Sequence, residues 1–211
     1  MIETTISYGL LPATDEGAYL AFVKGVADTA LKLPGVVGFS ARRNLLGSPQ
    51  VRVAIDWESL SHWAHYAQSK HWQRVTGDLR KFAEEPSVEL WKPLPMRRAL
   101  PPYERVEVSI TYERLPELQT SRPAELLQAF EHLMASEDGV GFGVSARMLS
   151  VPALRFLMIW DSLVEWAEFA ESDSWQQFVD ELGSVARSLR TQFWTSSPYL
   201  PDLHKPQPDS R

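Results

Sequence analysis

The chain has 211 residues, of which 44% are hydrophobic and 23% charged, a composition typical of a globular protein with a substantial core. Its formal net charge of −6 argues against a nucleic-acid partner, because phosphate backbones are bound by clustered Lys and Arg. The absence of cysteine excludes disulfides, thiolate nucleophiles and cysteine-ligated metals or iron–sulfur clusters.

The first residues, Met1 to Tyr8, lack the basic flank and long apolar run of a signal peptide. No apolar stretch in the sequence approaches membrane-spanning length. The simplest prediction is therefore a cytoplasmic protein without a membrane partner.

The first half of the chain predicts an alternation of strands and helices. Residues 3–9 are rich in β-branched and aromatic side chains, which favours a strand. Apolar residues at helical spacing between Tyr19 and Leu33 then predict a helix with one face toward a core. Gly35 and Gly38 mark a turn into a second strand, which we expect to end near Arg42.

A third strand and a divided helix follow. Apolar and polar side chains alternate over residues 51–57, which is the period of a strand. Ser59 is the predicted N-cap of a helix that is interrupted near Ser69 and resumes to about Phe82. A last strand holds Trp91.

The proline-rich stretch from Pro93 to Pro102 is expected to interrupt any helix or central strand, because proline has no backbone N–H. The same order of elements then returns, with a strand over residues 105–113 and a helix for which Ser121 is the predicted N-cap. The tail from Ser196 carries four prolines, and we expect no regular element in it.

The eight tryptophans indicate that the chain is duplicated. They form four pairs, each separated by 103 positions: Trp57 and Trp160, Trp63 and Trp166, Trp72 and Trp175, and Trp91 and Trp194. Upstream of them, residues 40–42 match residues 145–147 at an offset of 105, which predicts a hairpin two residues shorter in the second copy. We expect a first repeat in residues 1–98 and a second repeat in residues 99–211.

Each copy has the order β-α-β-β-α-β, the ferredoxin-like arrangement of an antiparallel sheet with helices on one face. The predicted fold class is therefore α+β, with two ferredoxin-like repeats fused in one chain. A sheet that is apolar on its second face needs a cover, and the tethered copy can supply it. We therefore expect the two repeats to pair within the chain as a pseudo-dimeric α/β barrel.

The segment Trp57-x-Ser59-x-x-x-Trp63-x-x-Tyr66-x-x-Ser69-x-x-Trp72 resembles the most recognisable stretch of the antibiotic-biosynthesis-monooxygenase (ABM) superfamily. The second copy repeats the pattern from Trp160 to Trp175, with phenylalanine at the tyrosine position. The resemblance implies the dimeric α/β-barrel fold, which stand-alone members of the superfamily build by dimerising.

The superfamily includes cofactor-independent oxygenases that act on fused-ring aromatic substrates, and haem-degrading enzymes. Haem-degrading members carry a tryptophan three residues before the last serine of the pattern and a haem-ligating histidine seven residues after it. Those positions hold Tyr66 and Thr76 in the first copy, and Phe169 and Val179 in the second. The resemblance therefore disfavours haem degradation and implies an enzyme without a cofactor.

Polar aromatic side chains are concentrated in the first copy. Four of its residues have no polar aromatic counterpart in the second copy. The residues His62, His65, Tyr66 and His71 correspond to Glu165, Glu168, Phe169 and Ser174. On a helix, His62 and Tyr66 share a face. We hypothesise that His62 accepts a proton near neutral pH and that Tyr66 hydrogen-bonds a substrate oxygen. The alternative is that both are partly exposed helix residues.

Other residues are candidates for substrate binding. Trp63, Trp72 and Phe39 suit an aromatic pocket, although core packing explains them as well. Arg42 and Arg147, at what the sequence match suggests are equivalent strand ends, suit an anionic or phenolate group, and the alternative is an ion pair with the opposite copy. Further members of this set are Asn44, Arg52 and Arg155. No metal site is expected, because no His-x-x-x-His pair occurs.

The sequence thus predicts an oxygenase-like enzyme that acts without a metal on a hydrophobic, aromatic small molecule. The alternative is a non-catalytic binding or assembly protein with the same fold. A small molecule is the expected partner in either case, and association of the fused chain into a homodimer is left open.

Overall fold

A computed structural model describes residues 1–46, 50–98, 105–114, 122–196 and 203–204. The chain forms two compact units, Met1–Lys92 together with Ser196–Arg211, and Pro93–Thr195. This division by packing differs from the predicted division of the sequence between residues 98 and 99. The reason is that Leu94 and Met96, which end the first sequence repeat, pack against the core of the second unit.

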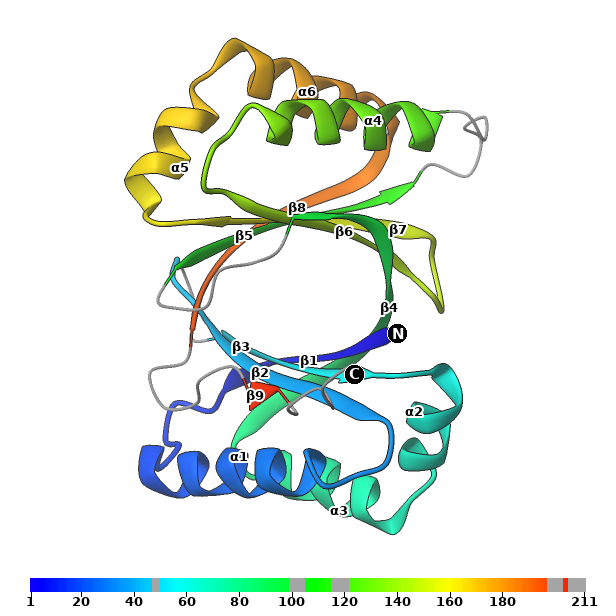
Figure 1. Cartoon of the computed structure of the whole chain (residues 1–211). Helices are drawn as coiled ribbons and strands as arrows, with labels where there is room; N and C mark the ends of the chain where they lie inside the picture. Colours follow the sequence, from blue (N-terminus) through cyan, green and yellow to red (C-terminus); the bar gives the residue numbers. More distant parts are fainter. Residues whose placement is uncertain (47–49, 99–104, 115–121, 197–202, 205–211) are drawn as a thin grey trace, which may run out of the picture. The chain divides into compact units, whose positions relative to one another are not determined.

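The first unit is a four-stranded antiparallel sheet with three helices, joined by a short strand from the tail (Figure 1). Its elements are β1 (Ile2–Leu10), α1 (Glu16–Ala30), β2 (Val36–Asn44), β3 (Gln50–Trp57), α2 (Leu60–Ala67), α3 (Lys70–Leu79), β4 (Ala83–Arg98) and β9 (Leu203–His204). The strand order β4-β1-β3-β2 follows from the pairings of β1 with β3 and β4 and of β2 with β3.

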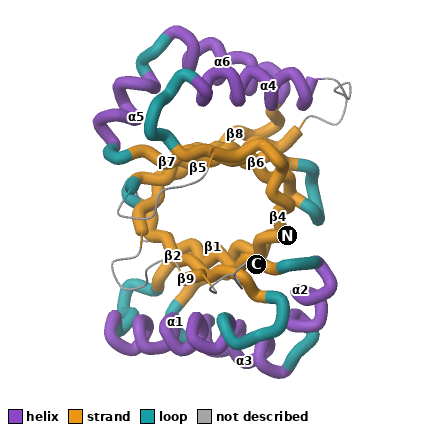
Figure 2. The backbone as a smooth tube through the Cα atoms, viewed as in Figure 1, coloured by secondary structure: helices purple, strands orange, loops and turns teal. Residues whose placement is uncertain are grey.

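The second unit repeats this arrangement. Its elements are β5 (Val106–Arg114), α4 (Arg122–Ala135), β6 (Gly141–Arg147), β7 (Ala153–Trp160), α5 (Leu163–Ala170), α6 (Asp173–Val185) and β8 (Ala186–Ser196). The strand order is β8-β5-β7-β6, again antiparallel. In each unit the helices cover one face of the sheet (Figure 2). The predicted β-α-β-β-α-β order of both copies is confirmed.

Local sequence explains where the first helix begins and ends. Asp15 caps α1 by accepting a hydrogen bond from the Ala18 N–H at 2.8 Å. The helix buries Tyr19 and three smaller residues against the sheet. The chain then turns at Gly35, whose φ of +76° lies in the left-handed region that favours glycine.

The stretch from Pro93, which was predicted to interrupt any helix or central strand, continues β4. β4 runs through Pro93 and Pro95 to Arg98. Successive residues of a strand point their N–H groups to opposite edges, so prolines at alternate positions remove donors from one edge only. Residues 99–102, the rest of that stretch, lie outside the described residues.

The hairpin between the second and third strands has the same length in both units, which contradicts the predicted shortening. Arg43 pairs with Val51, and Ala146 pairs with Leu154. Both pairs are related by 103 positions, so the sequence match at an offset of 105 does not describe equivalent positions.

The tail is also more regular than predicted. Leu203 and His204 form β9, which pairs with Phe39 and Gly38 of β2. The predicted N-cap Ser121 lies outside the described residues. Among the helices that the structure describes, none is long and apolar enough to cross a membrane.

Candidate functional site

The two serines of the ABM-like pattern are helix N-caps. Ser59 accepts a hydrogen bond from the His62 N–H at 3.3 Å, and Ser69 accepts one from the Trp72 N–H at 3.1 Å. The second cap ends α2 and starts α3 after a bend. The last turn of α2 therefore lies beside the first turn of α3, and the rings of Tyr66 and Trp72 meet with centroids 5.5 Å apart.

Tyr66 is the centre of an aromatic cluster between these helices and the sheet. Its ring centroid lies 5.2 Å from that of Trp57 and 5.8 Å from that of His71. The residue is only 6% exposed, and burial raises the pKa of its phenol to about 12. Tyr66 is therefore a neutral hydrogen-bond donor at physiological pH.

Three polar atoms of this cluster are buried without a hydrogen-bond partner among the described residues. They are the hydroxyl of Tyr66, Nε2 of His71 and Nε1 of Trp57. Leaving a buried polar group unpaired costs about 1–3 kcal/mol. Such a cost is recovered when a ligand or water supplies the missing partner.

The equivalent cluster of the second unit has an apolar side chain, Phe169, at its centre. Phe169 stands where the first unit has Tyr66, with its ring centroid 4.8 Å from Trp160 and 5.0 Å from Trp175. The equivalent of His71 is Ser174, which is exposed. The buried phenol and imidazole of this cluster are therefore found in the first unit alone, whereas a tryptophan Nε1 without a partner among the described residues occurs in both units, at Trp57 and Trp160.

Two predicted substrate-binding tryptophans also differ between the units. Trp63 and Trp72 are half-buried, whereas their equivalents Trp166 and Trp175 are 8% and 4% exposed. The first aromatic cluster is therefore more accessible than the second.

His62 does not join Tyr66 in this cluster. Its side chain is 40% exposed, and Nδ1 lies 3.1 Å from the Ser59 hydroxyl and 3.7 Å from Glu58 Oε2. The imidazole lies against the backbone of Gly35, where a Cβ would overlap the ring. His65 is exposed, and its Nδ1 lies 2.8 Å from the Ser61 carbonyl oxygen. The structure therefore brings Tyr66 together with His71, a residue absent from the predicted site.

The contact between His62 and Gly35 leads to a prediction with a matched control. Gly35 and Gly139 both have positive φ, +76° and +78°, but only Gly35 has a side chain where its Cβ would be. Gly139→Ala should cost about 1–2 kcal/mol of stability through backbone strain. Gly35→Ala should cost at least about 1 kcal/mol more, because His62 must move as well. Urea unfolding checks this, and equal losses in the two variants would contradict the contact.

The predicted equivalence of Arg42 and Arg147 is wrong. Arg42 pairs in register with Arg52, whereas Ser145 pairs with Arg155. Arg42 therefore corresponds to Ser145, and the sequence match was two residues out of register. Ser145 accepts a hydrogen bond from Arg155 at 3.3 Å.

The other predicted binding residues have structural contacts within their own repeat. Arg147 forms a 3.0 Å ion pair with Glu113, and this hydrogen bond holds the pKa of the Glu113 carboxyl below its usual value. Asn44 Oδ1 accepts a hydrogen bond from the Leu46 N–H at 2.8 Å, which stabilises the hairpin turn. Phe39 is 1% exposed in the core.

Thr76, at the haem-ligand position of the ABM-like pattern, hydrogen-bonds within its own helix. The Thr76 hydroxyl donates to the Trp72 carbonyl at 3.0 Å and to the Gln73 carbonyl at 3.2 Å. Within the described residues, no three His, Asp or Glu side chains are grouped as a metal site would require.

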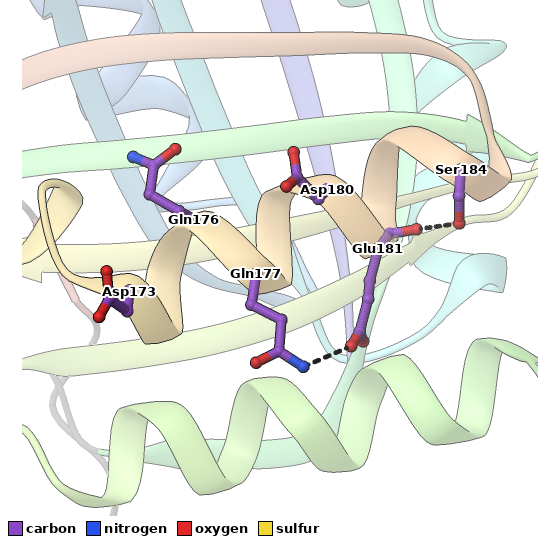
Figure 3. Close-up of a pocket in the computed structure, with 6 residues that line it drawn as sticks. All are labelled: Asp173, Gln176, Gln177, Asp180, Glu181 and Ser184. Carbon is purple, nitrogen blue, oxygen red and sulfur yellow. Dashed lines mark hydrogen bonds between the residues drawn. The ribbon is translucent and has the colours of Figure 1, made fainter.

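A groove lies along the exposed face of α6 in the second unit (Figure 3). It is lined by exposed polar residues: Asp173, Gln176, Gln177, Asp180, Glu181 and Ser184. Gln177 donates to Glu181 Oε1 at 3.2 Å, and Ser184 donates to the Glu181 carbonyl at 2.7 Å. These contacts are those of a solvated helix face.

Solved structures with the same fold are numerous, although the sequences have diverged. No protein-family model matches the chain, and no curated protein shows a significant match. A protein described as anthrone oxidase-like superposes with a TM-score of 0.78 at 12% identity, over 96% of this chain and 92% of the other. The chain has the dimeric α/β-barrel fold.

Two further neighbours are described as candidate monooxygenases. The one from Fusobacterium nucleatum has a TM-score of 0.68 at 9% identity, with 97% of each chain covered. The one from Lactobacillus acidophilus has a TM-score of 0.64 at 10% identity, with 92% of each chain covered. The predicted dimeric α/β-barrel fold, with its two ferredoxin-like repeats, is thus confirmed, and it is a fold found in monooxygenase-type proteins.

Proposed function

We propose that the first repeat binds a hydrophobic aromatic small molecule and oxidises it with molecular oxygen. The observation that carries the proposal is the pair of buried, unpartnered atoms, Tyr66 Oη and His71 Nε2, within an aromatic cluster. Trp72 and Trp63 offer half-buried ring faces on which an aromatic substrate can stack. The likeness to proteins described as monooxygenases supports this reading at the level of the fold alone.

The chemistry that suits these groups begins with removal of a proton from an activated methylene carbon between two aromatic rings. His71 Nε2 accepts this proton as the general base. The C–H electron pair stays on the substrate and is delocalised onto its oxygen. Tyr66, as a neutral phenol, donates a hydrogen bond to that oxygen and stabilises its negative charge.

Molecular oxygen then takes four electrons from the substrate in total. One oxygen atom forms the new carbonyl group, and the other leaves as water with the two hydrogens of the methylene group. The net reaction converts one methylene group and one molecule of dioxygen into one carbonyl group and one molecule of water. It balances without an external reductant because the substrate supplies every electron.

The test is oxygen uptake with a panel of anthrone- and quinol-type substrates. Tyr66→Phe and His71→Ser introduce the residues that the second repeat carries at these positions, so the fold should tolerate them. Each variant should lower kcat by about 100-fold or more, the usual effect of losing an acid–base group. His65→Gln should leave the rate unchanged, because that side chain is exposed and held at Ser61.

The His62→Gln variant distinguishes His71 as the proton acceptor from His62, which was the proton acceptor predicted from the sequence. Loss of activity in His62→Gln with full activity in His71→Ser would return the role of base to His62. Uptake that is absent from the wild type over the whole panel would refute the oxygenase and leave a binding role for the same cluster.

A further inference from the structure

A second groove of the second unit lies between α4 and α6, beside the groove along the exposed face of α6. The two grooves share Gln177 and Glu181. Figure 3 shows both side chains extending from α6 toward α4. The groove between the helices is also lined by the buried ring of Phe178 and the half-buried side chain of Leu133. It therefore offers apolar atoms together with a carboxylate.

The exposed face of α6 is acidic. Asp173, Asp180 and Glu181 are all exposed, and no Lys or Arg occurs between Asp173 and Val185. Residues separated by seven and eight positions share a face of a helix, so α6 presents the three carboxylates together. This face therefore carries negative charge that no cation of the same helix offsets.

The equivalent face of the first unit is basic. Ser69 and Ser172 cap α3 and α6 at matched positions, so the residues of the two helices correspond at the offset of 103. The exposed cations in and just after α3, each with its counterpart in the second unit, are Lys70 and Asp173, Arg74 and Gln177, and Lys81 and Ser184. The single carboxylate of this stretch, that of Asp78, is paired with Lys81 at 2.7 Å.

The two faces are complementary in chemistry as well as in charge. Lys70 and Arg74 are one helical turn apart, so they project from the same face of α3. Lysine and arginine pack their aliphatic stems on apolar atoms while their charged heads remain at a polar edge. The groove beside Phe178 and Glu181 provides both kinds of surface.

We propose that the α3 face of one copy, defined by Lys70, Arg74 and Lys81, binds the groove between α4 and α6 of a second copy. Lys70 and Arg74 then lie over the groove and pair with the carboxylates of Asp180 and Glu181. The occupant is a second copy because the chain itself carries a basic face that matches the acidic one. The contact joins unlike surfaces, so it is heterologous. It goes beyond the proposed oxygenase activity and does not depend on it.

Sedimentation equilibrium of the full chain tests the contact. Exposed ion pairs are individually weak and screened by salt, so the association should be weak and salt-dependent. At about 0.1 M salt the wild type should associate as its concentration rises toward about 1 mM. At about 1 M salt the dissociation constant should rise about tenfold or more, because the screening length falls from about 10 Å to about 3 Å. A wild type that stays monomeric throughout at the lower salt concentration would overturn the proposal.

Two charge-reversal variants test which faces meet. Lys70→Glu with Arg74→Glu makes the α3 face acidic, and Asp180→Lys with Glu181→Lys makes the groove basic. Each variant alone should associate about tenfold more weakly than the wild type, or less, because its two faces then carry like charge. An equimolar mixture should associate again, since the acidic α3 face of one variant meets the basic groove of the other. A mixture that remains monomeric would exclude the pairing of these faces.

The control reverses two charges elsewhere on the second unit. Glu165 and Glu168 are exposed on α5, so Glu165→Lys with Glu168→Lys changes the net charge as much as the groove variant does. This control should associate like the wild type. All the substituted side chains are exposed, so every variant should fold as the wild type does. Equal loss of association in the control and the groove variant would assign the effect to net charge and overturn the proposal.

Discussion

Replacing Phe130 by alanine is expected to lower the free energy of unfolding by about 3–5 kcal/mol, the range for deleting a buried aromatic side chain. The ring is fully buried and has three aromatic neighbours. Its centroid lies 4.7 Å from that of Phe156, 5.6 Å from that of Phe178 and 5.9 Å from that of Phe142. Removing it leaves a space among rigid rings that cannot collapse into it.

The measurement is urea unfolding followed by tryptophan fluorescence. Val164→Ala is the control, because Val164 is 66% exposed on α5 and its truncation should change stability by less than about 0.5 kcal/mol. A loss of about 1 kcal/mol or less in Phe130→Ala would mean that the helices move in to fill the space. The aromatic packing of the second repeat would then not be rigid.

The fold was predictable because the four tryptophan pairs reveal the duplication. Trp57 and Trp160 end equivalent strands, and both are nearly fully buried. A strand that must place such a ring in the core tolerates little change at that position. The offset of 103 therefore survives where surface positions have diverged.

The register of the second strand was not predictable, because short matches of small and charged residues are weak evidence. The sequence match aligns Arg42 with Arg147 of the second copy. In the sheet, Arg42 lies opposite Arg52 and Ser145 lies opposite Arg155, so Arg42 corresponds to Ser145. A shift of two residues keeps every side chain on the same face of the sheet, so hydrophobic alternation does not detect it. Only the hydrogen-bonded partners fix the register.

The site was predictable in part. Tyr66 was found because the second copy has phenylalanine at the equivalent position. The same comparison points to His71, whose equivalent in the second copy is Ser174. His62 was preferred instead because it shares a helical face with Tyr66. That argument compares only residues of α2 and leaves out the next helix. The cap at Ser69 starts a new helix, which brings His71 to Tyr66 while His62 packs against Gly35.

The differences between the repeats fall into one pattern. Where the first repeat has the phenol of Tyr66 and the imidazole of His71, the second has Phe169 and an exposed Ser174. At these two positions the second repeat has no buried polar group, although Trp160 Nε1, like Trp57 Nε1, is buried without a partner among the described residues.

Alkaline pH should destabilise the protein strongly, and Tyr66 should account for a measurable share. Burial raises its pKa to about 12, whereas a tyrosine in the unfolded chain titrates near pH 10. Its contribution to stability is complete below pH ~10 and is lost as the pH rises through about 12. Above that value the loss is on the order of 3 kcal/mol, from a shift of roughly two pKa units.

Three other tyrosines act in the same direction, because burial raises the pKa of Tyr8, Tyr19 and Tyr112 as well. Urea unfolding at pH 8 and at pH 11.5 should therefore show a larger loss in the wild type than in Tyr66→Phe. Absorbance at about 295 nm gives the matching titration, in which the variant should lack one phenol that ionises near pH 12. Equal alkaline losses in the two proteins would mean that water reaches the Tyr66 hydroxyl freely. A phenol hydrated in this way has no unpaired donor to offer a ligand, so the same result would remove the main support for a ligand site at Tyr66.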